Sequence, residues 1–371
     1  MSLRYFKRGV FKALKKDKWI FYLFEYFKWH REIEYQKQVN RAEDLKPQVQ
    51  IRREERLVRR YWRLGTFHYY RYGLQYKQLT EEQLLDYVPT YYFHKCLERH
   101  HEGLDTIKYG DKLEQARLFE ERGIPTSKVL AVVKGGDSWD IMERERLDIR
   151  DLIESKLSIA GNKLFFKPTG NCGGAGILVL KRGEGGLLVN GQEVASVEAF
   201  LLSLNKYYTY VVEENIIQHP QLSQINPSSV NTLRVVVQRE EDRMQIKTCI
   251  LRMGRLGKEV DNSAQGGISI KVDVATGELD KSATAEHGGG DLRCHPDTGY
   301  VFEGSTIEDW DNVRGCIEVI ANKLLDFNDI ALDIALTPTE AILVEFNFRY
   351  GVEHQQCVLG GVRQLLNISN R

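Results

Sequence analysis

The chain has 371 residues, which is long enough for two or three lobes with separate hydrophobic cores. Its formal net charge at pH 7 is zero, so the composition does not indicate a nucleic-acid partner, and we expect none. The charges are unevenly placed: through Arg63 the chain carries 18 Lys and Arg against 8 Asp and Glu, a net +10, and the remainder carries −10. A basic N-terminal region therefore precedes an acidic body.

The cysteines indicate the redox compartment to expect, and the apolar segments indicate whether the chain spans a membrane. Six cysteines occur without CxxC spacing, so the sequence predicts neither a zinc site nor a disulfide framework, and a reducing cytoplasm is the expected setting. The apolar run WIFYLFEYF near the N-terminus is short and contains Glu25. We do not expect it to span a bilayer or to act as a signal peptide.

Residues 3–37 predict about two amphipathic helices. The segment has no proline, has glycine only at Gly9, and places apolar residues near helical spacing. These residues are Phe6, Val10, Phe11, Leu14, Phe21, Phe24 and Phe27. Basic residues opposite aromatic ones are typical of a helix that lies on a membrane surface. A helix packed on its own domain has the same pattern, so peripheral contact with the inner face of a membrane and internal packing both stay open.

From Ile51 to His101 the sequence predicts further helices rich in aromatic residues. Thr80, followed by Glu-Glu-Gln, predicts a capping box that opens one of them. The tyrosines of this stretch are able to stack on a sugar, but the burial of their half-polar rings is the commoner use. They are Tyr69, Tyr70, Tyr72, Tyr91 and Tyr92.

Beyond residue 105 the pattern changes to mixed helices and strands. Asp111 precedes a helix that runs to about Arg122 and ends at Gly123 and Pro125. Strands are predicted at 128–133, 164–167, 176–181 and 209–214, with a helix near 196–206. Further strands follow at 231–238, 245–252, 267–273, 331–336 and 341–347, with a helix at about 306–325. This order predicts two α+β lobes after the helical region.

The segment LFFKPTGNCGGAGILV, residues 164–179, predicts two strands joined by a glycine-rich loop. Gly173, Gly174 and Gly176 let the backbone approach a ligand, and free N–H groups there are suited to phosphate oxygens. Lys167 adds a mobile positive charge. The loop is neither a GxxxxGK[ST] phosphate loop nor a dinucleotide fingerprint, because its spacing is GxxGGxG. A nucleotide site of another architecture is therefore expected.

A second set of candidate residues lies near the C-terminus, in DIALTPTEAILVEFNFRYG. Glu345 and Asn347 share one face of a strand because strand side chains alternate. The TPTEA segment predicts a hairpin turn, which brings Asp333 alongside them from the neighbouring strand. Three hard oxygen donors suit Mg²⁺, which takes one or two carboxylates and leaves its other positions to water and phosphates.

Several segments occur together in an order that resembles ATP-grasp ligases. They are DKLEQARLFEERGIP, the FKP and glycine-loop segment, VVEENI, NTLRVVV, and DIALT with VEFN. RMGRLGKEVDNSAQGG resembles the ribosomal-protein glutamate ligase group. The aromatic, basic N-terminal region and NTLR resemble the sugar-transfer-associated ATP-grasp group, which is found with polysaccharide biosynthesis. The resemblance covers about residues 106–360.

The resemblance implies an ATP-grasp fold, in which two α+β lobes sandwich ATP, preceded here by an α-helical N-terminal region. The expected parts are the helical region 1–105, an entry helix with a mobile lid lobe at 106–212, and a C-terminal lobe with the metal site at 213–371. By the same resemblance, ATP and Mg²⁺ are the cofactors, and Asp333, Glu345 and Asn347 hold two Mg²⁺.

The resemblance also implies nucleotide contacts for individual residues. Lys112 and Lys167 contact the phosphates, and the loop 170–176 closes over them. A hinge segment reads adenine through its backbone, with one glutamate accepting from the exocyclic amine or facing the ribose; its residues are Glu213, Glu214, Asn215 and Ile216, after Val212.

The implied catalytic residues are Arg234, Arg252 and Asn262. The two arginines bind the γ-phosphate and the acyl phosphate formed from it, because guanidinium forks suit phosphate geometry. Asn262, with Gly266 and Gly267, lies against the reacting groups.

The activity implied is amide formation between a carboxylate and an amine through an acyl phosphate, on a small or saccharide-linked carboxylate. A kinase that phosphorylates a hydroxyl uses the same nucleotide site, and a non-catalytic recruiting module of a polysaccharide-assembly complex is the third alternative. Two features depart from the family pattern. No acidic ribose ligand follows the hinge, and AEHGGGDLRCHP, with His287 and Asp291, has no counterpart.

Overall fold

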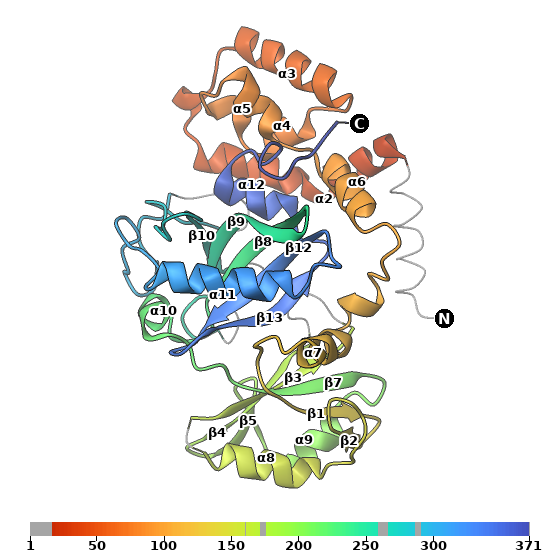
Figure 1. Ribbon diagram of the computed structural model, residues 1–371. Coiled ribbons are helices and arrows are strands. Elements are labelled where there is room, and N and C mark those ends of the chain that lie inside the picture. The colour runs from red at the N-terminus through yellow and green to blue at the C-terminus, as the bar shows by residue number, and fades with distance from the viewer. Residues whose placement is uncertain (1–16, 160, 171–175, 259–265, 286–290, 371) are drawn as a thin grey trace.

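The computed structural model describes residues 17–159, 161–170, 176–258, 266–285 and 291–370 (Figure 1). Four predicted site features, namely Gly173, Gly174, Asn262 and His287, lie outside these residues, as does the predicted helix before residue 17. The described chain has an α+β fold, with a helical N-terminal region and two antiparallel sheets, as the sequence predicts. No helix in the described ranges is both long and apolar enough to cross a bilayer.

The N-terminal helices form one end of the molecule (Figure 1). They are α2 (Lys18–Val39), α3 (Gln48–Trp62), α4 (Phe67–Arg71), α5 (Glu81–Asp86) and α6 (Thr90–His100), with single 3-10 turns at Ala42–Asp44, Leu74–Tyr76 and Lys108–Gly110. The capping box at Thr80 is confirmed, since its side chain accepts from the Gln83 N–H and the Gln83 side chain accepts in return. Tyr69, Tyr72 and Tyr92 are buried, which is the expected use of these rings.

The buried and exposed side chains of helix α2 do not follow the apolar pattern of the sequence. Phe21 is buried, but Phe27 on the same predicted apolar face is 71% exposed. The buried face is instead largely polar, because Glu32 forms an ion pair with buried Arg71 of α4. Internal packing therefore holds for one side of α2, while an apolar stripe stays on its other side.

A group of four ionisable residues, the helical cluster, joins α2 and α4 to the C-terminal helix α12 (Val352–Leu359). Its members are Glu25, Glu32, Arg71 and Glu353. Arg71 lies 3.5 Å from a carboxylate oxygen of Glu353 in addition to its pair with Glu32. Burial, with the nearby charge of Glu353, raises the pKa of Glu25 to about 8. Glu25 is therefore protonated at neutral pH, which limits the negative charge placed inside the protein.

The first sheet has the order β2-β1-β7-β3-β4-β5-β6 and is antiparallel throughout. Its strands are β1 (Val129–Lys134), β2 (Asp137–Trp139), β3 (Lys163–Pro168), β4 (Leu178–Gly183), β5 (Gly186–Val189), β6 (Gln192–Val194) and β7 (Thr209–Glu214). Helices α8 (Ile149–Leu157) and α9 (Val197–Ser203) pack on it, with Phe166 and Phe200 in ring contact at 4.8 Å. The predicted β3–β4 hairpin around the glycine-rich loop is confirmed.

The second sheet has the order β11-β10-β9-β8-β12-β13. Its strands are β8 (Thr232–Glu240), β9 (Arg243–Met253), β10 (Ile268–Val272), β11 (Thr284–Ala285), β12 (Asp329–Leu336) and β13 (Ala341–Asn347). Helices α10 (Pro220–Ile225) and α11 (Trp310–Asn322) accompany it. Val235 and Leu332 pack into the core with α11, whereas Val236 and Ala331 pack against the N-terminal helices. Both faces of the sheet are therefore covered, because neighbouring residues on a strand point to opposite faces.

Helix α7 (Lys112–Glu121) and the two chain segments that lead into and out of the first sheet all contact one hairpin of the second sheet. Pro125, on the way into the first sheet, accepts a hydrogen bond from the N–H of Leu343 in β13 at 2.8 Å. His219, on the way out, donates its N–H to Leu336 of β12, also at 2.8 Å. The division into a helical region and two α+β lobes stays our proposal, and its boundary at residue 212 falls within β7.

Candidate active site

The C-terminal hairpin brings the predicted metal ligands together. Asp333 of β12 lies opposite Glu345 of β13 in the strand register, next to a bulge. The turn closes with a hydrogen bond from the Thr337 N–H to the Glu340 carbonyl at 2.9 Å. The Asn347 amide lies 3.4 Å from a Glu345 carboxylate oxygen, so both side chains point to one side of β13. The predicted hairpin and the shared face of Glu345 and Asn347 are confirmed.

Helix α7 places a lysine against this hairpin. The Lys112 ammonium lies 2.8 Å from a Glu345 oxygen. Gln115, one turn later, holds the helix in place, because its side-chain amide donates to the Phe346 carbonyl at 2.9 Å and accepts from the Phe346 N–H at 3.1 Å. Burial alone raises the pKa of Glu345, but the charge and hydrogen bond of Lys112 outweigh it and bring the pKa to about 2. Glu345 is therefore ionised at neutral pH.

Two arginines from adjacent strands converge on Asp333. Arg234 of β8 lies opposite Asp333 in the register and binds both carboxylate oxygens through its guanidinium fork, with one contact at 2.8 Å. Arg252 of β9 approaches the same carboxylate at 3.4 Å. Burial raises the pKa of Asp333, and the two arginines act in the opposite direction. Together Lys112, Arg234, Arg252, Asp333, Glu345 and Asn347 form what we call the hairpin cluster.

The hairpin cluster fits a divalent cation in its donor chemistry. Glu345 and Asn347 offer an ionised carboxylate and an amide oxygen side by side, which are ligands that Mg²⁺ prefers. A carboxylate has about four acceptor positions, so Asp333 retains capacity beyond its contacts with the arginines. The described residues contain no group of three His, Cys, Asp or Glu side chains arranged as a metal site, so the amide is needed to complete this set.

The hairpin cluster gathers three cationic side chains around two carboxylates and one amide. Lys112, Arg234 and Arg252 also take part in interactions outside this set. Cationic side chains beside a carboxylate–amide pair are suited to an anion bound together with a metal ion, and a nucleotide triphosphate is such an anion.

A second charged group lies on the first sheet, on strands β3 and β7. The Lys167 ammonium of β3 lies 2.8 Å from Glu213 of the adjacent strand β7, and the Ser127 hydroxyl donates to the same carboxylate. Two residues after Lys167, the Thr169 carbonyl accepts a hydrogen bond from the Lys112 N–H at 3.2 Å. That bond ties the start of the loop to the helix that carries Lys112 of the hairpin cluster.

The other predicted hinge residues follow along and beyond β7. Glu214 pairs with Lys156 of α8 at 2.7 Å. Asn215 exchanges hydrogen bonds with the backbone of Lys163, through its own N–H and its side-chain oxygen, and Ile216 follows half-buried. The predicted Gly176 has φ +79°, in the left-handed region that suits glycine.

The segment AEHGGGDLRCHP is described again from Asp291 onward. The described residues there form no group of metal-binding side chains. His295 is buried and contacts the Gly254 carbonyl through Nε2 at 2.9 Å, while its neighbour Cys294 is exposed. The five described cysteines are all free thiols. Asp291 is exposed and lies 4.0 Å from Arg293.

One residue near the arginine pair is missed by the sequence motifs. His354 of α12 lies close enough to Arg252 and Arg234 that burial and their positive field lower its pKa to about 3. Its Nε2 is buried and has no hydrogen-bond partner within the described residues. The only sequence signal is its position seven residues after Asn347, and a single histidine after a strand predicts little by itself.

One protein family and several solved structures are similar to this chain. The profile of a family described as sugar-transfer associated ATP-grasp matches residues 101–368. No curated protein sequence matches the chain.

Among solved structures, the chain is similar to phosphoribosylamine–glycine ligase from Thermotoga maritima, with 14% identity over 67% of this chain and 49% of that chain and a TM-score of 0.36. It is also similar to N5-carboxyaminoimidazole synthase from Aspergillus clavatus, in complex with ADP and 5-aminoimidazole ribonucleotide, with 12% identity, coverage of 79% and 64%, and a TM-score of 0.37. D-alanine–D-alanine ligase from Helicobacter pylori matches with 12% identity, coverage of 71% and 58%, and a TM-score of 0.35. The chain thus spans less than two thirds of the length of each.

Proposed function

The chain belongs to the sugar-transfer associated ATP-grasp family, whose profile matches more than two thirds of its residues, and we propose that it is an ATP-dependent carboxylate–amine ligase. The observation that carries the proposal is the hairpin cluster, in which a carboxylate–amide pair stands beside three cationic side chains. The substrate class is a small or saccharide-linked carboxylate, in keeping with the sugar-transfer association of the family.

The proposed reaction has two steps. A carboxylate oxygen of the substrate attacks the γ-phosphorus of ATP, the bond to the bridging oxygen breaks, and ADP leaves with that electron pair. The amine nitrogen then attacks the carbonyl carbon of the acyl phosphate, the carbon–oxygen bond breaks, and phosphate leaves while the nitrogen loses a proton. The protein contributes chiefly positioning and charge neutralisation, because phosphoryl transfer leaves it little covalent work.

The residues of the hairpin cluster have distinct proposed roles. Asp333, Glu345 and Asn347 would hold Mg²⁺, which would supply neutralisation of the phosphate charge. Arg234 and Arg252 orient the γ-phosphate and the acyl phosphate, exchanging part of their contact with Asp333 for phosphate oxygens.

The nucleotide contacts are proposed on both sides of the cluster. Lys112 binds phosphate oxygens from α7, and Lys167 does so from β3 by leaving Glu213. The backbone of Gly173, Gly174 and Gly176 closes over the phosphates, the hinge segment Glu213–Ile216 reads adenine, and Asn262 lies against the reacting groups.

A substrate screen with two readouts tests the proposal. The purified protein is incubated with MgATP, uronic acids and amino acids in pairs, and the release of inorganic phosphate is measured. Hydroxylamine is then added in place of the amine, because it traps an acyl phosphate as a hydroxamate. A ligase releases phosphate and forms hydroxamate with its own acid.

The two rival activities give different results in this screen. A kinase transfers the phosphoryl group to a hydroxyl and releases no inorganic phosphate, so a phosphorylated sugar without hydroxamate would replace the ligase proposal. A recruiting module that does not turn over ATP would give neither product with any acid, although it would still bind its assembly partner.

We also propose that α2 contacts an anionic membrane surface through its exposed apolar stripe. Trp19, Leu23 and Phe27 are between 51% and 71% exposed and recur at helical spacing. The preceding residues 1–16 carry six Lys and Arg and no acidic residue. Each basic residue near an anionic surface contributes about 1 kcal/mol, so the charge of this region complements such a surface.

Vesicle binding tests the membrane contact without removing α2, whose Glu32 pairs with Arg71. The full-length double variant Leu23→Ser/Phe27→Ser is expected to bind phosphatidylglycerol vesicles several-fold less tightly than the native chain. The control is Leu202→Ser/Tyr207→Ser, two exposed apolar residues on or next to α9. Equal vesicle binding by the native chain and the stripe variant would contradict the membrane contact.

A further inference from the structure

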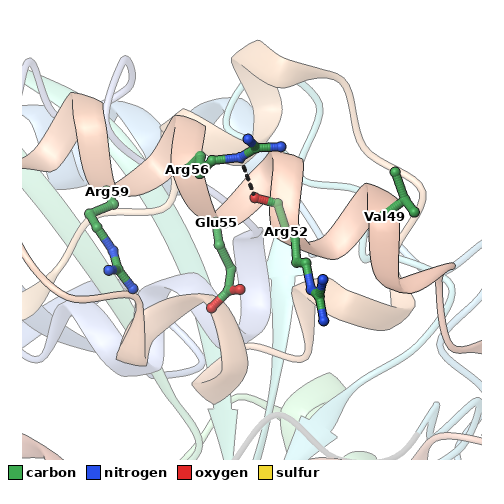
Figure 2. A pocket seen from close by; sticks show the side chains of 5 residues that line it. All are labelled: Val49, Arg52, Glu55, Arg56 and Arg59. Carbon is green, nitrogen blue, oxygen red and sulfur yellow. Dashed lines mark hydrogen bonds between the residues drawn. The ribbon is translucent and has the colours of Figure 1, made fainter.

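Helix α3 carries a groove on the far side of the six-stranded sheet from the first lobe (Figure 1). Its volume is about 500 Å³, and it is lined by Val49, Arg52, Glu55, Arg56 and Arg59. Figure 2 shows these side chains arising from the same helix, with the Arg56 Nε donating to the Arg52 carbonyl at 3.2 Å. A groove of this volume is within the range of small-molecule sites. Its lining carries three positive charges and one negative charge.

The three arginines of the groove differ from their charged neighbours Arg53 and Glu54 in their pairing. Arg53 forms an ion pair with Glu81 at 2.7 Å, and Glu54 forms one with Lys46 at 2.7 Å. Arg52, Arg56 and Arg59 are exposed and form no ion pair with any residue that the structure describes, and the same holds for Arg60, which does not line the groove. The groove therefore presents three guanidinium groups that are open to solvent.

The spacing of these arginines costs helix stability. Positions 52 and 56 are four residues apart and positions 56 and 59 are three apart, so the side chains are neighbours on one helix face. Like charges at such positions destabilise a helix by about 0.2–0.5 kcal/mol per pair. Glu55 does not relieve the repulsion fully, because its carboxylate accepts from the Thr66 hydroxyl at 3.1 Å and also hydrogen-bonds Tyr70. An anionic ligand in the groove would offset that repulsion.

Arg52, Arg56 and Arg59 form a row along α3, and the length of this arginine row indicates what kind of anion fits. Arg52 and Arg59 are seven residues apart, which is about 10 Å along a helix. Three planar forks over this length exceed the size of one carboxylate or one phosphate, and guanidinium forks bind phosphate oxygens in pairs. Two phosphate groups close together, as in a diphosphate or in neighbouring lipid head groups, match the row best.

The neighbourhood of the groove adds an apolar surface. Arg59 lies near enough to Tyr22 of α2 to oppose the rise that burial causes in the pKa of that phenol. The Lys18 ammonium donates to the Arg63 carbonyl at 3.1 Å, so the start of α2 lies beside the end of α3. Exposed Trp19 and Leu23 lie on α2 in the same two turns as Lys18 and Tyr22. A ligand with phosphates and an apolar part would contact both helices.

We infer that Arg52, Arg56 and Arg59 form a binding site for a ligand bearing two adjacent phosphate groups, separate from the hairpin cluster. This site goes beyond the proposed ligase activity and requires no turnover. It gives the helical region a recognition role of its own.

Calorimetry with inorganic pyrophosphate tests the inference on the full-length protein, with MgADP present at saturation so that a nucleotide site is already filled. The native chain is expected to bind one pyrophosphate, and Arg52→Gln/Arg56→Gln/Arg59→Gln is expected to bind it at least about 10-fold more weakly, since it lacks the three charge-assisted contacts. The matched control Arg53→Gln/Lys95→Gln/Arg99→Gln removes the same charge from exposed positions outside the groove and should bind as the native chain does.

Phosphatidylglycerol vesicles form the second arm and distinguish the source of the phosphates. Pyrophosphate binding that depends on the three arginines assigns the site to a soluble or saccharide-linked diphosphate. Vesicle binding that depends on them, without pyrophosphate binding, assigns it to lipid head groups. Absence of both, or an equal loss in the control triple, would overturn the site. Melting temperature and circular dichroism check the fold of each variant, and Arg56→Gln alone replaces the triple if the triple does not fold.

Discussion

The helical cluster and the hairpin cluster are both built from ion pairs, yet they are opposite in charge balance and exposure. In the helical cluster, Arg71 is 4% exposed and faces more carboxylates than it neutralises, and Glu25 holds a proton to limit the excess. In the hairpin cluster, Lys112 and Glu345 are 19% and 31% exposed, and three cationic side chains surround two carboxylates. The contact distances are similar in both, so distance alone does not tell a structural ion pair from a functional one.

The difference between the two clusters follows from how the charges in each are neutralised. A closed, buried cluster must neutralise itself, by pairing or by proton uptake, because a buried charge without a partner is costly. An open cluster whose side chains are partly exposed is accessible to a ligand from outside the chain. The predictions below separate the two kinds by changing one pair at a time.

The largest expected effect is the loss of turnover in Glu345→Gln and in Asn347→Ala. Phosphate release with the productive substrate pair should fall by about 1000-fold or more, because the metal ion would lose a ligand at the phosphates. The melting temperature should change little, since both side chains are half-exposed and contribute little packing. Glu340→Gln, in the exposed turn of the same hairpin, is the control. Native rates of phosphate release in both variants would remove the metal assignment.

The next largest effect is the loss of stability in Lys46→Met. Lys46 is fully buried and lies 2.7 Å from Glu54, which the change would leave as a buried unpaired carboxylate. Breaking a buried pair costs about 3–5 kcal/mol, and the lower end applies here because Gln50 and Tyr69 still donate to Glu54. Urea unfolding measures this.

Two further measurements complete the test of the Lys46 pair. Arg53→Gln breaks an exposed pair with Glu81 and should cost less than about 1 kcal/mol. Turnover by the folded fraction of Lys46→Met should equal that of the native chain. A stability loss as small as that of the control would mean that burial does not decide how much an ion pair of this chain contributes to stability.

The pH dependence of stability comes from Glu25. Its pKa is about 8 in the folded protein against 4.5 ordinarily, so between these pH values the folded chain keeps a proton that the unfolded chain releases. Stability is therefore greatest below pH 4.5 for this group and falls as pH rises to about 8, by a few kcal/mol at most. Melting curves across this window measure the slope. Glu25→Gln should flatten it, and an unchanged slope would refute the assignment to Glu25.

The smallest of the four effects is expected for Lys167→Ala, which should weaken ATP binding by about 10- to 100-fold. One charge-assisted contact is worth about 1.5–3 kcal/mol. Lys167→Arg should restore the affinity poorly, because a planar fork does not replace a point charge. Calorimetry with MgATP measures both, with the exposed Lys128→Ala as the control. Unchanged affinity in Lys167→Ala would place the nucleotide site elsewhere.

The hairpin is the part of the site that the sequence predicts best. Alternation along VEFN and the turn residues TPTE determine the face and the register locally, so Asp333, Glu345 and Asn347 are placed together as expected. The predicted strands and helices after residue 105 also occur in the expected order, although β2, β5, β6, β11, α8, α10 and α12 are missed because they are short or weakly patterned.

The contacts that no local pattern predicts are those between distant elements. The pair of Lys112 with Glu345 depends on Gln115 binding the backbone of β13, more than 200 residues later in the chain. The polar buried face of α2 likewise depends on Arg71 and Glu353, which lie on other helices. Helical periodicity alone therefore does not tell which side of α2 is buried, since tertiary pairing decides it.

The two hydrogen bonds at Pro125 and His219 bear on how the chain can be engineered. Both junctions of the first lobe meet the same hairpin, at Leu343 and Leu336, so residues 126–218 leave the second lobe and come back to it at one place. In the proposed division α7 belongs with the first lobe, yet its Gln115 binds the backbone of β13 in the second sheet. Insertions whose ends lie close together can be exchanged as units. Residues 126–218 meet that condition, so this segment is a suitable unit for exchange with the matching segment of a relative.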